Sequence, residues 1–215
     1  MVFVYRPHPI RARPVAPQVQ PDTMTWTIKR EVAMSVTERT FEAIALEDFD
    51  RKWELHRGRL REKPAMTWDH NGGSLDLAVQ LYTQLDRRLY RVNHDSGRLR
   101  RQDVTYYIPD VFVVPASYGV DLRGRQDRLQ IHDGPALLVV EVWSPSTGDY
   151  DIDAKLPEYR ARGDLEIWRL HPYDRVLTVW RRQDDGSYET FQQTGGTIQP
   201  IALPGVTIDL DALFD

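Results

Sequence analysis

Three side chains that lie far apart along the chain could together hydrolyse a phosphodiester bond: Asp110, Glu141 and Lys155. Glu141 lies inside the run LLVVEVW at residues 137–143, whose density of branched apolar residues predicts a strand buried on both faces. A carboxylate in such a strand is costly unless it is paired or binds a metal ion. Asp110 lies in a similar run, residues 107–114. Two such acids with a lysine nearby are the components of a divalent-metal phosphodiesterase.

Each of the three residue types meets one need of that reaction. A magnesium ion held by one or two carboxylates neutralises charge at phosphorus and keeps positions open for water and phosphate. An ammonium group can orient the attacking water and stabilise developing charge. The chain has 24 arginines and only four lysines, so Lys155 suggests a need for a compact amine whose pKa can shift. Asp151, four residues earlier on an expected helix, could pair with it.

Each candidate also has a simpler interpretation. Asp110, which follows a proline, could close a turn, Glu141 could form a structural salt bridge, and Lys155 could be a solvated helix cation. His70 is an accessory candidate that could touch a phosphate or a water, or could be a loop histidine without a role. Glu54 is a candidate further metal-site acid, for which a surface cross-strand pair is the favoured alternative.

The surrounding elements follow from apolar spacing and turn residues. A helix is expected with Ser74 as its N-cap and with an apolar face made of Leu75, Ala78, Val79, Tyr82, Leu85 and Leu89. A second helix is expected over residues 149–162, ended by Gly163, although Pro157 weakens this prediction. A short helix is expected over 41–49, and strands over 53–60 (with a turn at Gly58), 98–102, 105–114, 137–143, 165–170, 176–181 and 188–191.

Residues 115–135 form a polar, arginine-bearing segment between two predicted strands. A loop longer than about 12 residues is usually functional or mobile. Its arginines (Arg123, Arg125 and Arg128) could contact a nucleic-acid backbone or simply keep a loop soluble.

The overall charge argues against a general nucleic-acid coat protein. The net charge is −4, and residues 41–215 alone carry 22 Lys/Arg against 29 Asp/Glu, a net of −7. The chain has no cysteine, which fits a reducing, cytoplasmic location. No apolar run approaches the ~20 residues needed to span a bilayer, and no secretory signal is expected.

The chain divides into two parts by composition. Residues 1–39 are expected to be a proline-rich, basic, disordered arm, and residues 40–215 a single nuclease-like domain. Met24 or Met34 could be the true start of translation.

Several short motifs together resemble a known family. They are Trp53-Glu54-Leu55 with Gly58, His70 before an amphipathic helix, Pro109-Asp110-Val111, residues 138–147 (LVVEVWSPST), Asp151 with Lys155 and Tyr159, residues 163–168, and Leu203-Pro204-Gly205. In their order and spacing, residues 41–215 resemble the Uma-two family of restriction endonucleases, within the PD-(D/E)XK nuclease superfamily.

The resemblance implies an α/β, restriction-endonuclease-like fold, with a mixed β-sheet core flanked by helices. It implies that Asp110 and Glu141 bind Mg²⁺ or Mn²⁺, with the main-chain carbonyl of Val142 as a further ligand. The superfamily's usual lysine position, two residues after the acid, is Trp143 here, so Lys155 would supply the amine from the next helix. A second departure is His171, where the family commonly has aspartate.

The leading hypothesis is therefore a metal-dependent endonuclease that cleaves DNA. The alternative is a catalytically inactive nuclease-fold protein that binds nucleic acid or a protein partner. The acid–acid–lysine set favours the first hypothesis, and the acidic body favours the second. A homodimer is expected by analogy, because this fold often pairs subunits to cut two strands.

Overall fold

The computed structural model describes residues 35–101 and 104–215. The predicted basic arm therefore lies largely outside the described residues, and so does residue 102 at the end of one predicted strand. Helix α1 (Glu38–Glu47) begins two residues before the expected start of the domain, with Thr37 as its N-cap.

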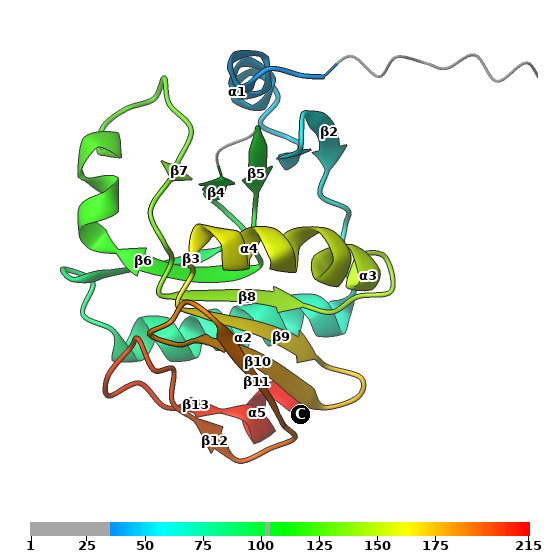
Figure 1. Cartoon of the computed structure of the whole chain (residues 1–215), viewed down its shortest axis with the longest axis vertical. Helices are drawn as coiled ribbons and strands as arrows, with labels where there is room; N and C mark the ends of the chain where they lie inside the picture. The colour runs from blue at the N-terminus through cyan, green and yellow to red at the C-terminus, as the bar shows by residue number, and fades with distance from the viewer. Residues whose placement is uncertain (1–34, 102–103) are drawn as a thin grey trace, which may run out of the picture. The chain divides into compact units, whose positions relative to one another are not determined.

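A mixed sheet of six strands forms the centre of the described domain (Figure 1). Its order is β11 (Tyr188–Gln193), β10 (Val176–Arg182), β9 (Glu166–His171), β8 (Leu138–Val142), β6 (Val111–Pro115) and β3 (Tyr90–His94). Only β8 and β9 pair in parallel. A parallel pair needs a crossover, and the segment α3 (Gly148–Tyr150), η2 (Asp151–Lys155) and α4 (Leu156–Arg162) supplies it.

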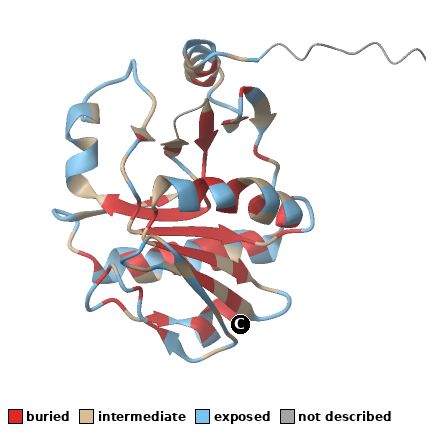
Figure 2. Ribbon diagram, viewed as in Figure 1, coloured by how far each residue is buried: buried red, intermediate tan, exposed pale blue. Residues whose placement is uncertain are grey.

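Both faces of this sheet are covered, which explains the apolar runs of β6 and β8 (Figure 2). Helix α2 (Trp68–Gln84) and helix α5 (Leu210–Phe214) pack on the face that carries Val111 and Val113. Helix α4 packs on the other face, against Phe112 and Val139. Alternate residues of one strand thus enter two separate cores, as the two-residue period of a strand requires.

A second sheet has the order β2 (Arg59–Glu62), β1 (Trp53–His56), β5 (Thr105–Tyr107), β4 (Arg98–Arg101) and β7 (Ile131–His132). Helix α1 packs on it through Phe41 against Leu55 and Tyr106. Gly58 has a φ of 78° in the β1–β2 turn, so the predicted strand–turn–strand at 53–60 is confirmed. Strands β12 (Thr197–Ile198) and β13 (Ile208–Asp209) form a separate pair.

Two predictions about α2 were wrong. The helix begins at Trp68 with Thr67 as its N-cap, so Ser74 is a buried residue of the helix interior. The predicted core face is also wrong in part. Ala78 and Leu85 are buried in the core, but Leu75, Val79 and Tyr82 are about half exposed. Leu89 lies beyond the end of the helix, and the residues that pack on the sheet include Leu77, Ala78 and Leu81.

Three predicted segments are subdivided. The run 105–114 is two strands in different sheets, because the chain leaves β5 before Pro109 and enters β6 at Val111. Residues 115–135 contain the 3₁₀ helix η1 (Ala116–Leu122) and strand β7, rather than one irregular loop. The helix expected over 149–162 is α3, a π-helical turn (η2) and α4. Pro157 lies at the start of α4, where its missing N–H is tolerated, and Gly163 ends that helix with a φ of 78°.

No helix in the described part of the chain is long and apolar enough to cross a membrane.

Candidate functional site

The two central acids meet at one end of the six-stranded sheet. Strands β6 and β8 are antiparallel with Val111 opposite Val140, so Asp110 at the start of β6 lies beside the Glu141 end of β8. The Val142 amide donates a hydrogen bond of 2.7 Å to Asp110 Oδ2, which ties the two strand ends together. Both acids are buried.

Lys155 joins this pair from the crossover segment. Its Nζ lies 3.1 Å from both carboxylate oxygens of Glu141, 3.3 Å from Asp151 Oδ1 and 3.6 Å from Glu54 Oε1. The π-helical turn η2 ends at Lys155, and such turns are frequent at functional sites. Burial alone would lower the pKa of Lys155, but the surrounding carboxylates hold it well above its usual value. The amine is therefore a fixed positive charge.

Asp110 is held by Lys63, which the sequence analysis did not single out, and by the accessory candidate His70. Lys63 Nζ lies 2.7 Å from Asp110 Oδ1 and donates to the Ile108 carbonyl and to Asp95. His70 Nε2 lies 3.0 Å from the other oxygen of Asp110. Burial by itself would raise the pKa of Asp110, but the Lys63 ammonium and His70 hold it well below its usual range.

Glu141 is in the opposite electrostatic situation. Burial raises its pKa to about 8, with Asp151 and Asp110 adding to the shift and Lys155 opposing it. The Tyr159 hydroxyl donates a hydrogen bond to Glu141 Oε1. Burial and the neighbouring Glu141 also raise the pKa of Tyr159 well above its usual value, so this hydroxyl keeps its proton. The two acids of the pair therefore differ strongly in basicity.

The two accessory candidates lie in the same cluster. Glu54 is buried and accepts a hydrogen bond of 2.8 Å from the Ile108 amide. The favoured alternative, in which Glu54 forms a cross-strand pair on the surface, was therefore wrong. His70 lies in the first turn of α2, not in a loop before it. Among the residues that the structure describes, its Nδ1 has no hydrogen-bond partner.

The buried charges of this cluster do not balance. Glu54, Asp110, Glu141 and Asp151 carry four negative charges when ionised, against two positive charges from Lys63 and Lys155. Within residues 35–101 and 104–215, no group of three or more His, Asp or Glu side chains is arranged to hold a metal ion. The expected ligand set has only two side chains, because its third ligand is a main-chain carbonyl. Burial raises the pKa of Glu141 and of Asp151, which disfavours their ionised forms. A divalent cation bound at these carboxylates would supply the positive charge that favours ionisation, so this acid-rich cluster fits such a cation.

Comparison with known proteins identifies a family for this sequence. The model of the Uma2 family, described as "Putative restriction endonuclease", matches residues 39–211. The chain belongs to the Uma2 family. The resemblance drawn from the motifs is thus confirmed.

A solved structure shares the fold. A "putative nuclease belonging to DUF820" from Anabaena variabilis ATCC 29413 matches with a TM-score of 0.62 and 17% sequence identity. The match covers 79% of this chain and 96% of the other. The α/β, restriction-endonuclease-like fold class is therefore confirmed. No curated protein matches the sequence.

Trp143 and His171, the two positions at which the resemblance led us to expect a departure from the family's pattern, contact each other. The rings of Trp143 and His171 stack with their centroids 4.2 Å apart and their planes at 26°. Gly148 makes room for this arrangement, since an added Cβ would lie 2.1 Å from Trp143 Nε1. The two rings therefore form one stacked pair, which lies beside the contacts of Asp110, Glu141 and Lys155 described above.

Sequence reasoning missed two further side chains at the site of this Uma2 protein, Lys63 and Tyr159. Lys63 follows β2 and has no local pattern around it, but its rarity as one of four lysines was an available signal. Tyr159 is one turn after Lys155 on α4 and was noted only as part of a family motif.

Proposed function

We propose that this Uma2 protein is a metal-dependent endonuclease that hydrolyses phosphodiester bonds in DNA. The observation that carries the proposal is the buried cluster in which Lys155 lies 3.1 Å from Glu141 while Asp110 lies beside it at the strand ends. The description of the family model, "Putative restriction endonuclease", supports phosphodiester hydrolysis as the class of reaction. The four buried carboxyl groups of the cluster outnumber its two buried lysines, which supports the divalent cation.

Magnesium or manganese is the proposed cofactor, held by Asp110, Glu141 and the main-chain carbonyl of Val142. When bound, such an ion polarises a phosphoryl oxygen and acidifies a coordinated water. Magnesium usually takes only one or two protein carboxylates and keeps several waters, which suits this small ligand set.

The chain's own residues supply positioning and charge. We assign Lys155 the role of orienting the attacking water and stabilising negative charge at the phosphate, because its ammonium is permanently charged and fixed by three carboxylates. Tyr159 fixes the orientation of Glu141 through its hydroxyl. Lys63 and His70 hold Asp110 ionised and in place.

The alternative is a nuclease-fold protein that binds nucleic acid or a protein partner without cutting. The net charge of −7 over residues 41–215 favours it, because general attraction to nucleic acid is absent. A cytoplasmic location and a homodimer stay predictions, the second of which light scattering tests directly.

Cleavage and metal binding, measured together, separate the two functions. Plasmid and oligonucleotide DNA are incubated with the protein in Mg²⁺ or Mn²⁺, with EDTA as the blank, and metal binding is followed by calorimetry. An endonuclease cuts with metal only, loses turnover in Lys155→Met while keeping metal binding, and loses metal binding in Asp110→Asn/Glu141→Gln. If the wild-type protein neither binds metal nor cuts DNA, the result supports the non-cutting alternative.

A further inference from the structure

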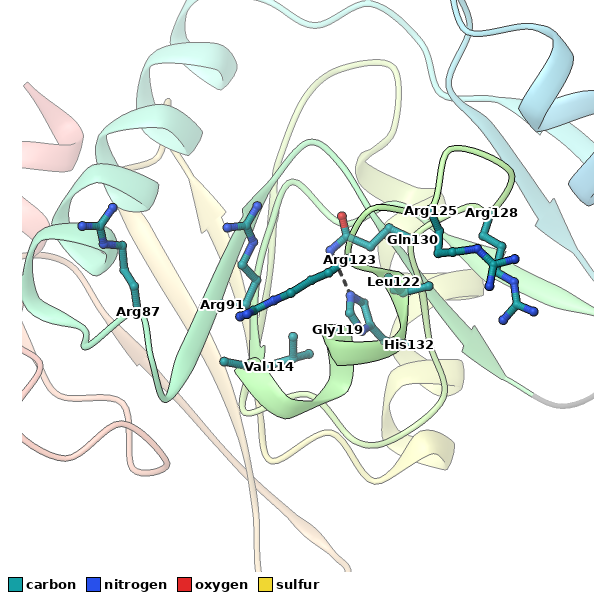
Figure 3. A pocket seen from close by; sticks show the side chains of 11 residues that line it. Arg87, Arg91, Val114, Gly119, Leu122, Arg123, Arg125, Arg128, Gln130 and His132 are labelled. Atoms are coloured by element: carbon teal, nitrogen blue, oxygen red, sulfur yellow. Dashed lines mark hydrogen bonds between the residues drawn. The ribbon is translucent and has the colours of Figure 1, made fainter.

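A cavity of about 330 Å³ lies at the opposite end of strand β6 from Asp110, and five arginines line it (Figure 3). They come from three segments of the chain. Arg87 follows α2, Arg91 is on edge strand β3, and Arg123, Arg125 and Arg128 follow η1. This size is at the lower end of ordinary small-molecule sites.

Most of this positive charge is uncompensated. Arg125 pairs with Asp127 at 2.7 Å, whereas Asp86, next to Arg87, pairs with Arg88, and Asp133, next to His132, pairs with Arg100. Asp121 lies two residues before Arg123 but forms no ion pair with it among the described residues. In the described part of the chain, no carboxylate lies within ion-pair distance of the remaining four cavity arginines. On a body whose net charge is −7, such a local concentration of arginine favours one compact anion over a general polyanion surface.

The wall of the cavity also contains an unsatisfied buried donor, His132, which is only 2% exposed. Gln130 Nε2 lies 3.0 Å from His132 Nε2 and donates a second hydrogen bond, of 2.6 Å, to Asn93 Oδ1. Because His132 Nε2 accepts, the proton of the neutral ring is on Nδ1. That N–H has no partner among the described residues. A buried donor without an acceptor destabilises the fold.

We propose that this cavity is a phosphate-binding site, separate from the acid–lysine cluster. The planar guanidinium of arginine donates two parallel hydrogen bonds to a phosphate, and several arginines can surround one phosphate group or a short chain of them.

The length of β6 separates the arginine cavity from the acid–lysine cluster at Asp110. Val114 lines the cavity and lies four residues after Asp110. At about 3.3 Å per residue, the two ends of this stretch are ~13 Å apart, so a phosphate in the cavity is not the one at Asp110. The ligand is either a free phosphate-rich anion or a distant phosphate of a nucleic-acid strand. Both present the same chemistry to the arginines, and the site does not depend on the proposed cleavage.

Calorimetric titration distinguishes these sources. Inorganic tripolyphosphate and a 12-nucleotide single-stranded DNA are titrated separately, in EDTA, into the full chain. The pocket variant is Arg91→Gln/Arg123→Gln. The control is Arg39→Gln/Arg182→Gln, which removes two exposed arginines outside the cavity and changes the net charge equally.

We expect the pocket variant to bind at least about tenfold more weakly and the control to bind as the wild type does. A loss for tripolyphosphate identifies a small-anion site, and a loss for DNA alone identifies a backbone-phosphate contact; both support the proposal. It is overturned if the wild type binds neither probe, or if the pocket and control variants weaken equally. Because both substituted arginines are exposed, circular dichroism should show an unchanged fold. A shift of the His132 Nδ1–H resonance on adding the probe is a second readout.

Discussion

The residues of the candidate site fall into two ion-pair groups that share one sheet end. Asp110 pairs with Lys63, which follows β2, and contacts His70 on α2, whereas Glu141 pairs with Lys155 on the crossover. Desolvation acts on both acids alike, but only Asp110 has a lysine at 2.7 Å to overcome it. The pKa values of the two acids therefore move in opposite directions, which is how one site keeps one strong and one weak base.

Lys63 should matter for stability far more than its neighbour Lys52. Both contact Asp95, but Lys63 is also buried against Asp110, whereas the side chain of Lys52 is 48% exposed. We expect Lys63→Met to lower the free energy of unfolding by about 3–5 kcal/mol, because it leaves a buried carboxylate unpaired. Lys52→Met should cost under about 1 kcal/mol. Urea denaturation of both variants tests this, and equal losses would refute the buried pairing. Adding Asp110→Asn to Lys63→Met should recover part of the loss.

The stacked pair Trp143 and His171 predicts energetic coupling between two positions 28 residues apart in sequence. Each single substitution, Trp143→Leu or His171→Asp, should destabilise the protein by removing one ring of the stack. The double substitution should cost less than the two single costs together, by about 0.5–1.5 kcal/mol. A double-mutant cycle in urea measures this term. Additive costs would show that Trp143 and His171 contribute to stability independently.

At the scale of elements, helix α2 shows what local sequence can and cannot specify. Its existence followed from apolar spacing, but apolar residues occur on two sides of it, so periodicity alone selected a face that is only partly buried. Its start was missed because Gly72 and Gly73 lie in the second turn, where glycine reads as a break in a helix. Packing settles both questions, since Gly73 faces Leu170 of β9, where an added Cβ would lie a tight 3.3 Å from Leu170 Cδ2.

A pair of leucines two residues apart tests this assignment of the α2 face. Leu77 is fully buried against the sheet, and Leu75 is 51% exposed. Leu77→Ala should lower the free energy of unfolding by about 2–5 kcal/mol, because it leaves a cavity in the core. Leu75→Ala, with the same change of side chain in the same helix, should cost under about 1 kcal/mol. Thermal or urea unfolding gives both values, and a larger loss at Leu75 would restore the face first predicted.

At the scale of the whole molecule, the sequence could not predict contacts between residues that lie far apart along the chain. The strands around Asp110 and Glu141 were predictable because their buried, branched runs are local signals. The ion pair of Lys63 with Asp110 spans 47 residues, and the arginines of the cavity come from segments up to 41 residues apart. No local pattern marks such partners, because sheet topology alone brings them together.

Several buried groups make the stability of the whole molecule depend on pH, and they act in opposite directions. Burial raises the pKa of Asp164 to about 6, so this group costs stability progressively as the pH rises from about 4 to 6. Burial and Arg162 lower the pKa of His132 to about 4. In the unfolded chain, the His132 ring takes up a proton near pH 6.5. The stability that the neutral ring contributes is therefore fully present above that pH and is lost as the pH falls toward 4.

Comparison with His132→Gln isolates the histidine contribution, because Asp164 titrates in both proteins. The advantage in unfolding free energy of the wild type over the variant should be constant above about pH 7. It should then fall by at most ~1.4 kcal/mol per pH unit between pH 6.5 and 4, since one proton is bound by the unfolded chain alone. Urea unfolding at pH 7.5, 6.5, 5.5 and 4.5 measures this difference. A difference that does not change with pH would mean that His132 is protonated equally in the folded chain, which would remove the neutral Nδ1–H donor from the wall of the arginine cavity. Bound tripolyphosphate should leave the ring neutral if Nδ1–H is the donor, so the histidine resonances recorded with and without it connect this stability profile to the proposed site.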